Sequence, residues 1–221
     1  MKRNGAKIIF APLIRIAPPR TWRPLDRALN TLIRYDAVVF TSSNAVDAFF
    51  KRLKGRSFSP RILAAVGHAT CQAVKKYGHV CSVVPEDARS AGLAKVLRVP
   101  RGSSVLIPRA ERGLTLLPNA LRKKGVIVNV VPVYRTLPDQ EGRRALRRAL
   151  INGADAVLFA SGSAAALGAA DVKLSGAAAV AIGPTTASVL RSRGVRPAAV
   201  SKKPDPKSFA RAAVLALRGR P

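Results

Sequence analysis

Residues 36–50 read DAVVFTSSNAVDAFF, and residues 155–169 read DAVLFASGSAAALGA, the same pattern 119 positions later. In each stretch a run of apolar residues ends in a turn of small polar residues, and a helical pattern follows. Short strands rich in valine and isoleucine that alternate with helices of about ten to fourteen residues indicate parallel sheets covered on both faces. An internal duplication of α/β units therefore decides the fold.

Three further pairs of segments extend the duplication. ILAAVGHATCQAVKKYG from residue 62 resembles AAVAIGPTTASVLRSRG from residue 178, and PEDARSAGLAKVLR from residue 85 resembles PDPKSFARAAVLALR from residue 204. GAKIIFAPLIRI from residue 5 resembles GVIVNVVPVYRT from residue 125. A strand and a helix over about 104–124 precede the second of these, whereas four residues precede Gly5. We therefore expect the first copy to lack a leading strand and helix, through either a real truncation or a misplaced start of the sequence.

The pattern predicts an α/β protein of two similar, flavodoxin-like domains with parallel sheets. One domain is expected over residues 19–131, and the other, discontinuous and N-terminally incomplete, over residues 1–18 and 132–221. The sheet of the second domain is expected to need the strand at 7–11. The chain then crosses between domains twice, which favours a paired, two-stranded linker. The expected strands cover residues 7–11, 37–41, 61–66, 80–84, 104–108, 127–131, 156–160, 178–182 and 197–200.

The composition points to a globular protein with an anionic partner. Apolar residues make up 48% of the chain, and 39 Lys and Arg against 11 Asp and Glu give a net charge of +28. Such a surface favours nucleic acid, anionic lipid or a polycarboxylate substrate. Two cysteines cannot form a disulfide framework, and no signal-peptide pattern or uncharged apolar run of about 18 residues is present. We therefore expect a cytoplasmic protein that does not span a membrane.

Four turns follow expected strands, at the edge of a parallel sheet where ligands bind. They are TSSN at 41–44, GHAT at 67–70, SGS at 161–163 and GPTT at 183–186. Each combines a small residue with side chains that cap a helix, and the helix N-terminus that follows attracts a carboxylate or phosphate. Either the turns only cap their helices, or two facing domains aim them into a shared cleft.

Other candidate residues allow two interpretations. Arg109, after the strand at 104–108, either faces the cleft or belongs to a solvated charge cluster. Tyr134 either packs at a hinge or acts as an acid or orienting donor. The set His68, Cys71, His79 and Cys81 lacks the tight ligand pairs of a closed zinc site, so we expect no metal there.

In order and spacing, these motifs resemble those of the uroporphyrinogen-III synthase family. The resemblance is carried by YDAVVFTSSNAVDAFF, AVGHATCQAVKKYG, VLIPRAERGLTLLPNALRKKGVIVNVVPVYRT, DAVLFASGSAAA and AIGPTTASVLRSRGV, and it covers nearly the whole chain. It implies two α/β domains with an active-site cleft between them. It also implies a lyase that cyclises hydroxymethylbilane to uroporphyrinogen III with inversion of the last pyrrole ring and loss of water. No metal or organic cofactor is implied. Family members normally begin with a strand, a TR-containing turn and a helix, which this chain does not show.

The resemblance also implies roles for residues. Tyr134 matches the tyrosine that assists loss of the hydroxyl group. The candidate substrate-binding residues, from the four turns and the charged cluster, are Thr41, Ser42, Ser43, Asn44, Gly67, Thr70, Arg109, Ser161, Gly162, Ser163, Gly183, Thr185 and Thr186.

We therefore expect a monomeric enzyme that acts on this small-molecule substrate. Two other functions stay open. A basic α/β protein could bind nucleic acid without sequence specificity, although its cations are scattered rather than gathered in one stripe. An inactive paralogue could keep the fold after losing its first unit.

Overall fold

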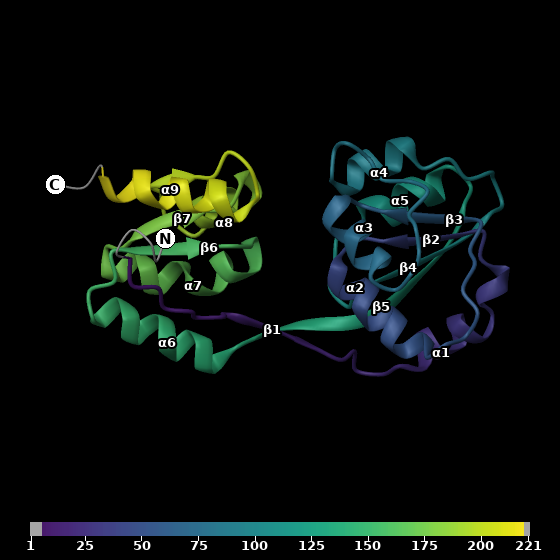
Figure 1. Ribbon diagram of the computed structural model, residues 1–221, viewed down its shortest axis with the longest axis horizontal. Helices are drawn as coiled ribbons and strands as arrows, with labels where there is room; N and C mark the ends of the chain where they lie inside the picture. The colour runs from purple at the N-terminus through teal and green to yellow at the C-terminus, as the bar shows by residue number, and fades with distance from the viewer. Residues whose placement is uncertain (1–5, 219–221) are drawn as a thin grey trace. The chain divides into compact units, whose positions relative to one another are not determined.

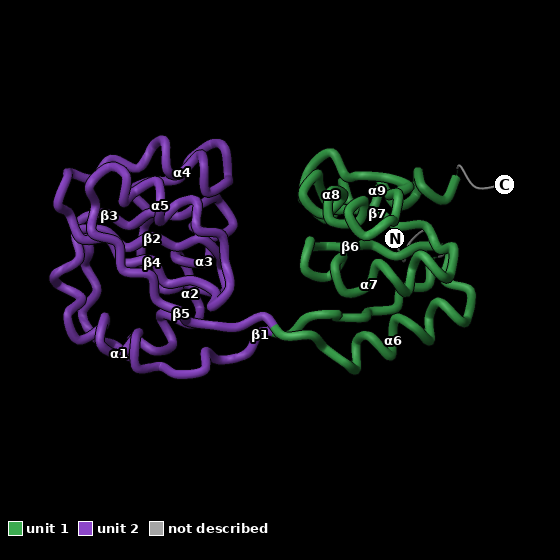
Figure 2. The backbone as a smooth tube through the Cα atoms, turned by 180° about the vertical axis from the view of Figure 1, so that it is seen from behind, with its two compact units in different colours: residues 1–15, 137–221 green, residues 16–136 purple. Residues whose placement is uncertain are grey.

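A computed structural model describes residues 6–218 and divides the chain into two compact units. Unit 1 comprises residues 1–15 and 137–221, and unit 2 comprises residues 16–136 (Figure 2). The sequence pattern places the same two boundaries at 18/19 and 131/132, a few residues away.

Unit 2 is built on a five-stranded sheet (Figure 1). Its strand order is β1 (Ile14–Ala17), β5 (Ile127–Pro138), β4 (Ser104–Ala110), β2 (Ala37–Phe40) and β3 (Ile62–Ala65). Strand β2 pairs in parallel with both β3 and β4, and β4 pairs in parallel with β5. All four residues of β2 are buried, as expected for an apolar central strand with helices on both faces.

Two apolar clusters cover the faces of this sheet. On one face Phe40 of β2 packs with Phe49 and Phe50. On the other face Leu93 and Leu117 lie in one cluster with Val39. The helices of unit 2 are α1 (Arg23–Asn30), the 3-10 helix η2 (Leu32–Arg34), α2 (Ser43–Leu53), α3 (His68–Lys75), α4 (Ser90–Val96) and α5 (Leu116–Lys123).

Unit 1 repeats this arrangement with fewer strands. Its described sheet holds β6 (Ala156–Phe159), β7 (Ala178–Ala181) and β8 (Ala199–Val200), all parallel and in that order. Residues of α6, α7 and α8 form a cluster with Phe159 on one face, and residues of α9 cover the other. The bounds of these helices are α6 (Gln140–Ile151), α7 (Gly162–Ser175), α8 (Pro184–Ser192) and α9 (Pro206–Arg218).

Two expected strands were wrong. Residues 80–84 form no strand, because Ser82 Oγ accepts the Leu63 N–H at 3.1 Å and donates to the Leu63 carbonyl at 3.2 Å, so that a side chain takes up part of the ladder. Only Val83 forms an isolated bridge, to Ala64. Residues 7–11 form no strand either, and the three described strands of unit 1 pair without them.

The chain passes between the units along two neighbouring strands. Strand β1 includes the boundary at 15/16 and β5 includes the boundary at 136/137, and the two are adjacent in the sheet order. The segment after Pro12 and the segment after Pro132 are therefore paired, and β5 carries Tyr134.

Candidate active site

The hydroxyl groups of Tyr134 and Ser42 lie together in unit 2, near the carboxyl end of strand β2. Tyr134 lies on β5 and is 9% exposed, and its Oη is 3.1 Å from Ser42 Oγ. Ser42 is the N-cap of α2, with extended backbone, and its Oγ accepts the Ala45 N–H at 3.2 Å. Because Ser42 Oγ already accepts this bond, its own hydrogen can be donated to Tyr134. The phenolic hydrogen of Tyr134 is then available to a ligand.

A pocket of about 210 Å³ adjoins this hydroxyl pair. Arg109 Nη1 donates to the Leu114 carbonyl at 2.5 Å, while its Nε is buried without a hydrogen-bond partner. The guanidinium of Arg109 lines the pocket, and a guanidinium binds carboxylates through charge-assisted hydrogen bonds, so the pocket suits a carboxylate. The lining residues are Thr41, Ser42, Ser90, Ile107, Arg109, Ala110, Arg112, Gly113, Leu114, Leu117, Pro118 and Tyr134.

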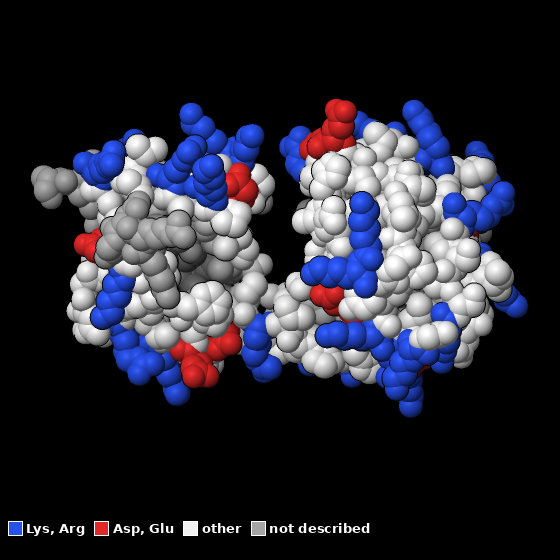
Figure 3. Space-filling view, viewed as in Figure 1, with Lys and Arg blue, Asp and Glu red and all other residues white. Residues whose placement is uncertain are grey.

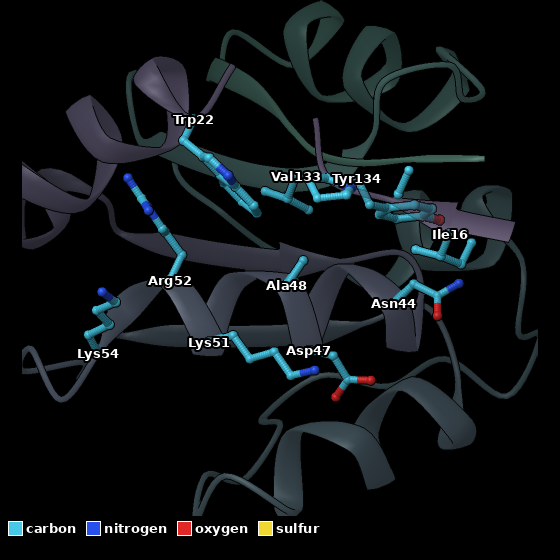
Figure 4. Close-up of a pocket in the computed structure, with 12 residues that line it drawn as sticks. Ile16, Trp22, Asn44, Asp47, Ala48, Lys51, Arg52, Lys54, Val133 and Tyr134 are labelled. Carbon is cyan, nitrogen blue, oxygen red and sulfur yellow. The ribbon is translucent and has the colours of Figure 1, made fainter. Parts of the chain in front are cut away.

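A second pocket, of about 440 Å³, is also lined by Tyr134 (Figure 4). Strand β5 and helix α2 form two of its walls, and Trp22 lies beside Arg52, whose guanidinium carbon is 5.3 Å from the ring centroid. Arg52 also donates to both carboxylate oxygens of Asp26 at 2.7 Å, and these hydrogen bonds lower the pKa of Asp26. Arg52 is thus held in place, and exposed Lys51 adds positive charge at the rim.

The other candidate residues of unit 2 have local structural roles. Ser43 Oγ donates to the Ala69 carbonyl at 3.3 Å and so ties α2 to α3, whereas Asn44 is exposed in the larger pocket. A Cβ on Gly67 would lie 2.8 Å from the Ala88 Cβ, so packing requires the glycine there. Thr70 is 5% exposed. Neither Gly67 nor Thr70 lines the two pockets.

In unit 1 the equivalent turns have nearly the same geometry. Ser161 caps α7 with φ −160° and ψ 155°, and its Oγ accepts the Ala164 N–H at 3.2 Å. Nothing lies within 4 Å of a Cβ built on Gly183, so a ligand could approach its backbone. Ser163 and Thr185 are exposed, Thr186 is buried, and Gly162 lies against Val189.

Sequence reasoning missed several residues of the two pockets. The only sequence signal for Ser90 was its match to Ser208 in the repeated segments, and the only signal for Arg112 was its positive charge close to Arg109. Trp22, the single tryptophan of the chain, follows a proline-rich stretch that predicted no site.

The cysteines and histidines lie in unit 2. His79 stacks on Phe50 with centroids 5.1 Å apart, and burial, helped by a hydrogen bond with Cys71, raises the pKa of Cys81 to about 12. Within residues 6–218 no group of three or more His, Cys, Asp or Glu could hold a metal ion. No helix of that same range is long and apolar enough to cross a membrane.

Comparison with known proteins gives consistent matches. A family model described as uroporphyrinogen-III synthase HemD matches residues 1–211. The chain is 32% identical over 163 residues to the uroporphyrinogen-III synthase of Synechococcus elongatus, covering 69% of this chain and 61% of the relative. It is 27% identical to the porphyrin biosynthesis protein HemD of Ruminiclostridium josui, covering 89% of this chain and 41% of that protein. The chain thus spans less than two thirds of the length of these two relatives.

Other relatives match over nearly their whole length. The uroporphyrinogen-III synthase of Chlorobaculum parvum is 27% identical, with 99% of this chain and 92% of the relative covered. A mutant uroporphyrinogen III synthase of Thermus thermophilus superposes with a TM-score of 0.72 at 24% identity, over 99% and 92% of the two chains. The enzyme of Helicobacter pylori gives a TM-score of 0.65 at 20% identity, over 95% of each chain.

At these identities the two solved structures support the two-domain α/β fold. The family model, in contrast, covers almost the entire sequence, including every turn and Tyr134. The chain therefore belongs to the uroporphyrinogen-III synthase family.

Proposed function

We propose that this chain is a lyase that cyclises hydroxymethylbilane to uroporphyrinogen III, with inversion of the last pyrrole ring and loss of water. The observation that carries the proposal is the Tyr134–Ser42 hydroxyl pair, which lies in a pocket that Arg109 also lines. This places a hydroxyl donor within the same pocket as a group that prefers a carboxylate.

The substrate class accounts for the positive charge around the site. Hydroxymethylbilane carries eight carboxylates, and arginine binds carboxylates through charge-assisted hydrogen bonds. Arg109 and Arg112 line the smaller pocket, and exposed Lys51 and Lys54 line the larger one. The turns opened by Ser42 and Ser161 add the positive ends of two helices.

The chemistry needs assistance chiefly at one bond. The C–O bond of the substrate's hydroxymethyl group breaks, and the oxygen leaves as water after it takes up a proton. Tyr134 Oη–H is the group we assign to this oxygen, with Ser42 donating to Tyr134 Oη as the phenolic proton moves away. Loss of water leaves a cationic azafulvenium, and attack on it by the substituted carbon of the last ring forms a spiro intermediate. Fragmentation of this intermediate and reclosure give the inverted ring, and the proton that the ring carbon loses as the pyrrole becomes aromatic again balances the one that Tyr134 gave up.

Because the open substrate also closes without inversion, the protein must hold one folded conformation of it. Positioning and electrostatics therefore matter more than a nucleophile. The Thr41 to Asn44 turn of unit 2 and the Ser161 to Ser163 and Gly183 to Thr186 turns of unit 1 are the candidates for this task. We propose that the enzyme works as a cytoplasmic monomer without a metal or organic cofactor.

An isomer assay tests the proposal. Freshly generated hydroxymethylbilane is supplied to the purified protein, the products are oxidised, and uroporphyrins I and III are separated by chromatography. A majority of type III supports the proposed reaction. Type I alone, the spontaneous product, from protein shown to be folded by circular dichroism, would overturn it.

Nucleic-acid binding remains the second candidate because cations outnumber acids in both units. On the face drawn in Figure 3 the cations are spread over both units without a single stripe. A steep fall of DNA affinity with rising salt, in protein that yields only type I product, would favour this function instead.

A further inference from the structure

The larger pocket of unit 2 has the size of a small-molecule site. Its volume is about 440 Å³, within the range of about 300–1,000 Å³ that such sites occupy, whereas the pocket at Arg109 measures about 210 Å³. It follows one side of helix α2, because its α2 residues recur at helical spacing from Asn44 to Arg52. Lys54 and Tyr134 lie at opposite ends of the pocket in Figure 4. A ligand that fills it therefore extends from Lys54 to Tyr134.

The middle of this pocket has apolar and aromatic walls. In Figure 4, Ala48 of α2 points toward Val133 of β5 and the ring of Trp22. The guanidinium carbon of Arg52 lies 5.3 Å from the Trp22 ring centroid, and Arg52 is itself held by both carboxylate oxygens of Asp26 at 2.7 Å. These contacts fix the position of the indole ring. A preformed space with an aromatic wall suits a flat ring.

A carboxylate also lines this pocket. Asp47 Oδ1 accepts the hydroxyl hydrogen of Tyr77 at 3.1 Å, and this bond holds the Asp47 side chain in place. Because an ionised carboxylate has lone pairs on both oxygens, Asp47 Oδ2 can accept a further donor. A hydrogen bond from a ligand N–H to this carboxylate would be charge-assisted and therefore strong. The pocket thus favours a ring that carries an N–H group.

Two lysines follow Asp47 along the same side of α2. Lys51 comes four positions after Asp47, and Lys54, the C-cap residue, three positions after Lys51. Both lysines are exposed, and neither forms an ion pair within residues 6–218. The charge of Arg52, in contrast, is matched by Asp26. Two unmatched ammonium groups at one end of the pocket suit a ligand with two carboxylates.

The backbone of Lys54 has a conformation that favours glycine. Its φ of 49° and ψ of 53° are left-handed, and it is the one non-glycine residue of the described range 6–218 with a positive φ. The equivalent helix of unit 1, α7, has Gly176 at its C-cap, with a φ of 69°. A side chain that is kept at a strained position beside a pocket points to a function for that side chain.

We propose that this pocket is a subsite for one pyrrole ring that carries an acetate and a propionate arm. The inference rests on the proposed function, because the rings of hydroxymethylbilane have this chemistry. The ring packs against Trp22, and its N–H donates to Asp47. Its two arms bind Lys51 and Lys54. Tyr134, at the other end of the pocket, then lies beside the carbon that links this ring to the rest of the substrate.

Binding of a single pyrrole tests the subsite without any turnover. The probe is opsopyrroledicarboxylate, a monopyrrole with one acetate and one propionate arm. The comparison ligand is the furan with the same two arms, which lacks the N–H group. Trp22 is the single tryptophan of the chain, so tryptophan fluorescence reports binding at this pocket. We expect the unmodified protein to bind the pyrrole at least about tenfold more tightly than the furan.

Asp47→Ala should remove the preference for the pyrrole over the furan, because it removes the acceptor of the ring N–H. Tyr77→Phe is the matched control, since it breaks the same Tyr77–Asp47 hydrogen bond but keeps the carboxylate, and it should keep the preference. Equal affinities of the unmodified protein for pyrrole and furan would overturn the proposal. So would an affinity for the pyrrole too weak to approach saturation at about 10 mM.

A pair of lysine substitutions tests the two arms. Lys51→Gln combined with Lys54→Gly should weaken binding of the pyrrole at least about tenfold. Because glycine suits the backbone at position 54, this variant should unfold at no lower urea concentration than the unmodified chain, so the loss is not due to unfolding. The matched control is Lys75→Gln with Lys76→Gln, which removes the same charge from exposed positions outside both pockets. An equal loss in both variants would show general attraction of an anion and overturn the subsite.

The binding measurements and the isomer assay can fail independently. Selective binding of the pyrrole by protein that yields only type I product would support the subsite and overturn the proposed reaction. Type III product from protein that does not distinguish the pyrrole from the furan would support the reaction and overturn the subsite.

Discussion

Units 1 and 2 share the same serine N-cap at the start of an equivalent helix, but the capping serine contacts a tyrosine in unit 2 only among the described residues. Ser42 and Ser161 cap α2 and α7 with φ of −162° and −160°, and each Oγ accepts an N–H three residues on at 3.2 Å. At the position aligned with Tyr134, 120 residues earlier, unit 1 has Ile14. The cap is therefore a property of the repeated fold, whereas the hydroxyl pair exists in one copy alone. This asymmetry supports the role proposed above for Tyr134.

The ion pairs that join equivalent helices have opposite polarity in the two units. In unit 2, Asp26 on α1 binds Arg52 on α2. In unit 1, Arg143 and Arg147 on α6 bind Asp171 on α7, and Asp171 lies 119 positions after Arg52. The helix pairing needs complementary charges but not a particular direction. The environments differ, because the Asp171 side chain is 9% exposed and that of Asp26 is 35% exposed.

The largest loss of stability is expected from removing a buried aromatic ring from the core of each unit. Phe40→Ala and Phe159→Ala remove equivalent rings that are 0% and 1% exposed, and each should cost about 3–5 kcal/mol of unfolding free energy. If the two units hold separate cores, each variant speeds hydrogen exchange in its own unit. Faster exchange at residues 178–181 in Phe40→Ala would contradict this independence.

Tyr134→Phe should lower turnover at least about 100-fold, because the variant removes the hydroxyl assigned to the leaving group while keeping the ring. Steady-state formation of uroporphyrinogen III measures the loss. Tyr35→Phe is the matched control, since the Tyr35 hydroxyl bonds Asn129 rather than Ser42. Unchanged turnover in Tyr134→Phe would remove Tyr134 from the mechanism.

Removing the aspartate of each interhelical ion pair should lower the free energy of unfolding by different amounts in the two units. Asp171→Asn leaves Arg143 and Arg147 without their largely buried partner and should cost about 2 kcal/mol. Asp26→Asn breaks a more exposed pair and should cost less than about 1 kcal/mol. Urea denaturation compares the two variants. Equal losses of unfolding free energy would show that burial of the aspartate does not determine how much the ion pair contributes.

The two capping serines separate stability from catalysis. Ser42→Ala and Ser161→Ala should each cost about 1 kcal/mol, because both leave a helix N–H without its acceptor. Ser42→Ala should also lower kcat, since it removes the partner of Tyr134, whereas Ser161→Ala should raise KM at nearly unchanged kcat. A fall in kcat of the same size in both variants would argue against a special role for the hydroxyl pair.

The smallest effect concerns pH. The hydrogen bonds from Arg52 lower the pKa of Asp26 below its usual 3.8. The stabilisation by Asp26 is therefore complete above the unfolded-state pKa and is lost as the pH falls through the lowered folded-state pKa. As the pH falls from about 5 to about 2, the urea concentration at the unfolding midpoint should decrease more steeply for the unmodified chain than for Asp26→Asn. Parallel curves would show that the pair does not contribute.

Periodicity predicted the family's fold class and most of the strands, because apolar strands and helix caps are local features. It failed at residues 80–84, where the Ser82 side chain replaces backbone hydrogen bonds of the ladder, and at 7–11, which pair with no strand among residues 6–218. Strand propensity depends on a partner, and a partner is not a local property.

The sequence by itself determined the duplication, the four capped turns, the excess of cations and the family. The tertiary structure decided the rest. It brought Ser42 within 3.1 Å of Tyr134 across 92 positions of sequence, and it placed Arg109 at the same pocket. It also left three residues of β6 partly exposed while burying all four of β2. Caps and apolar runs follow from contacts between near neighbours in the chain. Hydroxyl pairs, pockets and sheet edges depend on which distant segments meet.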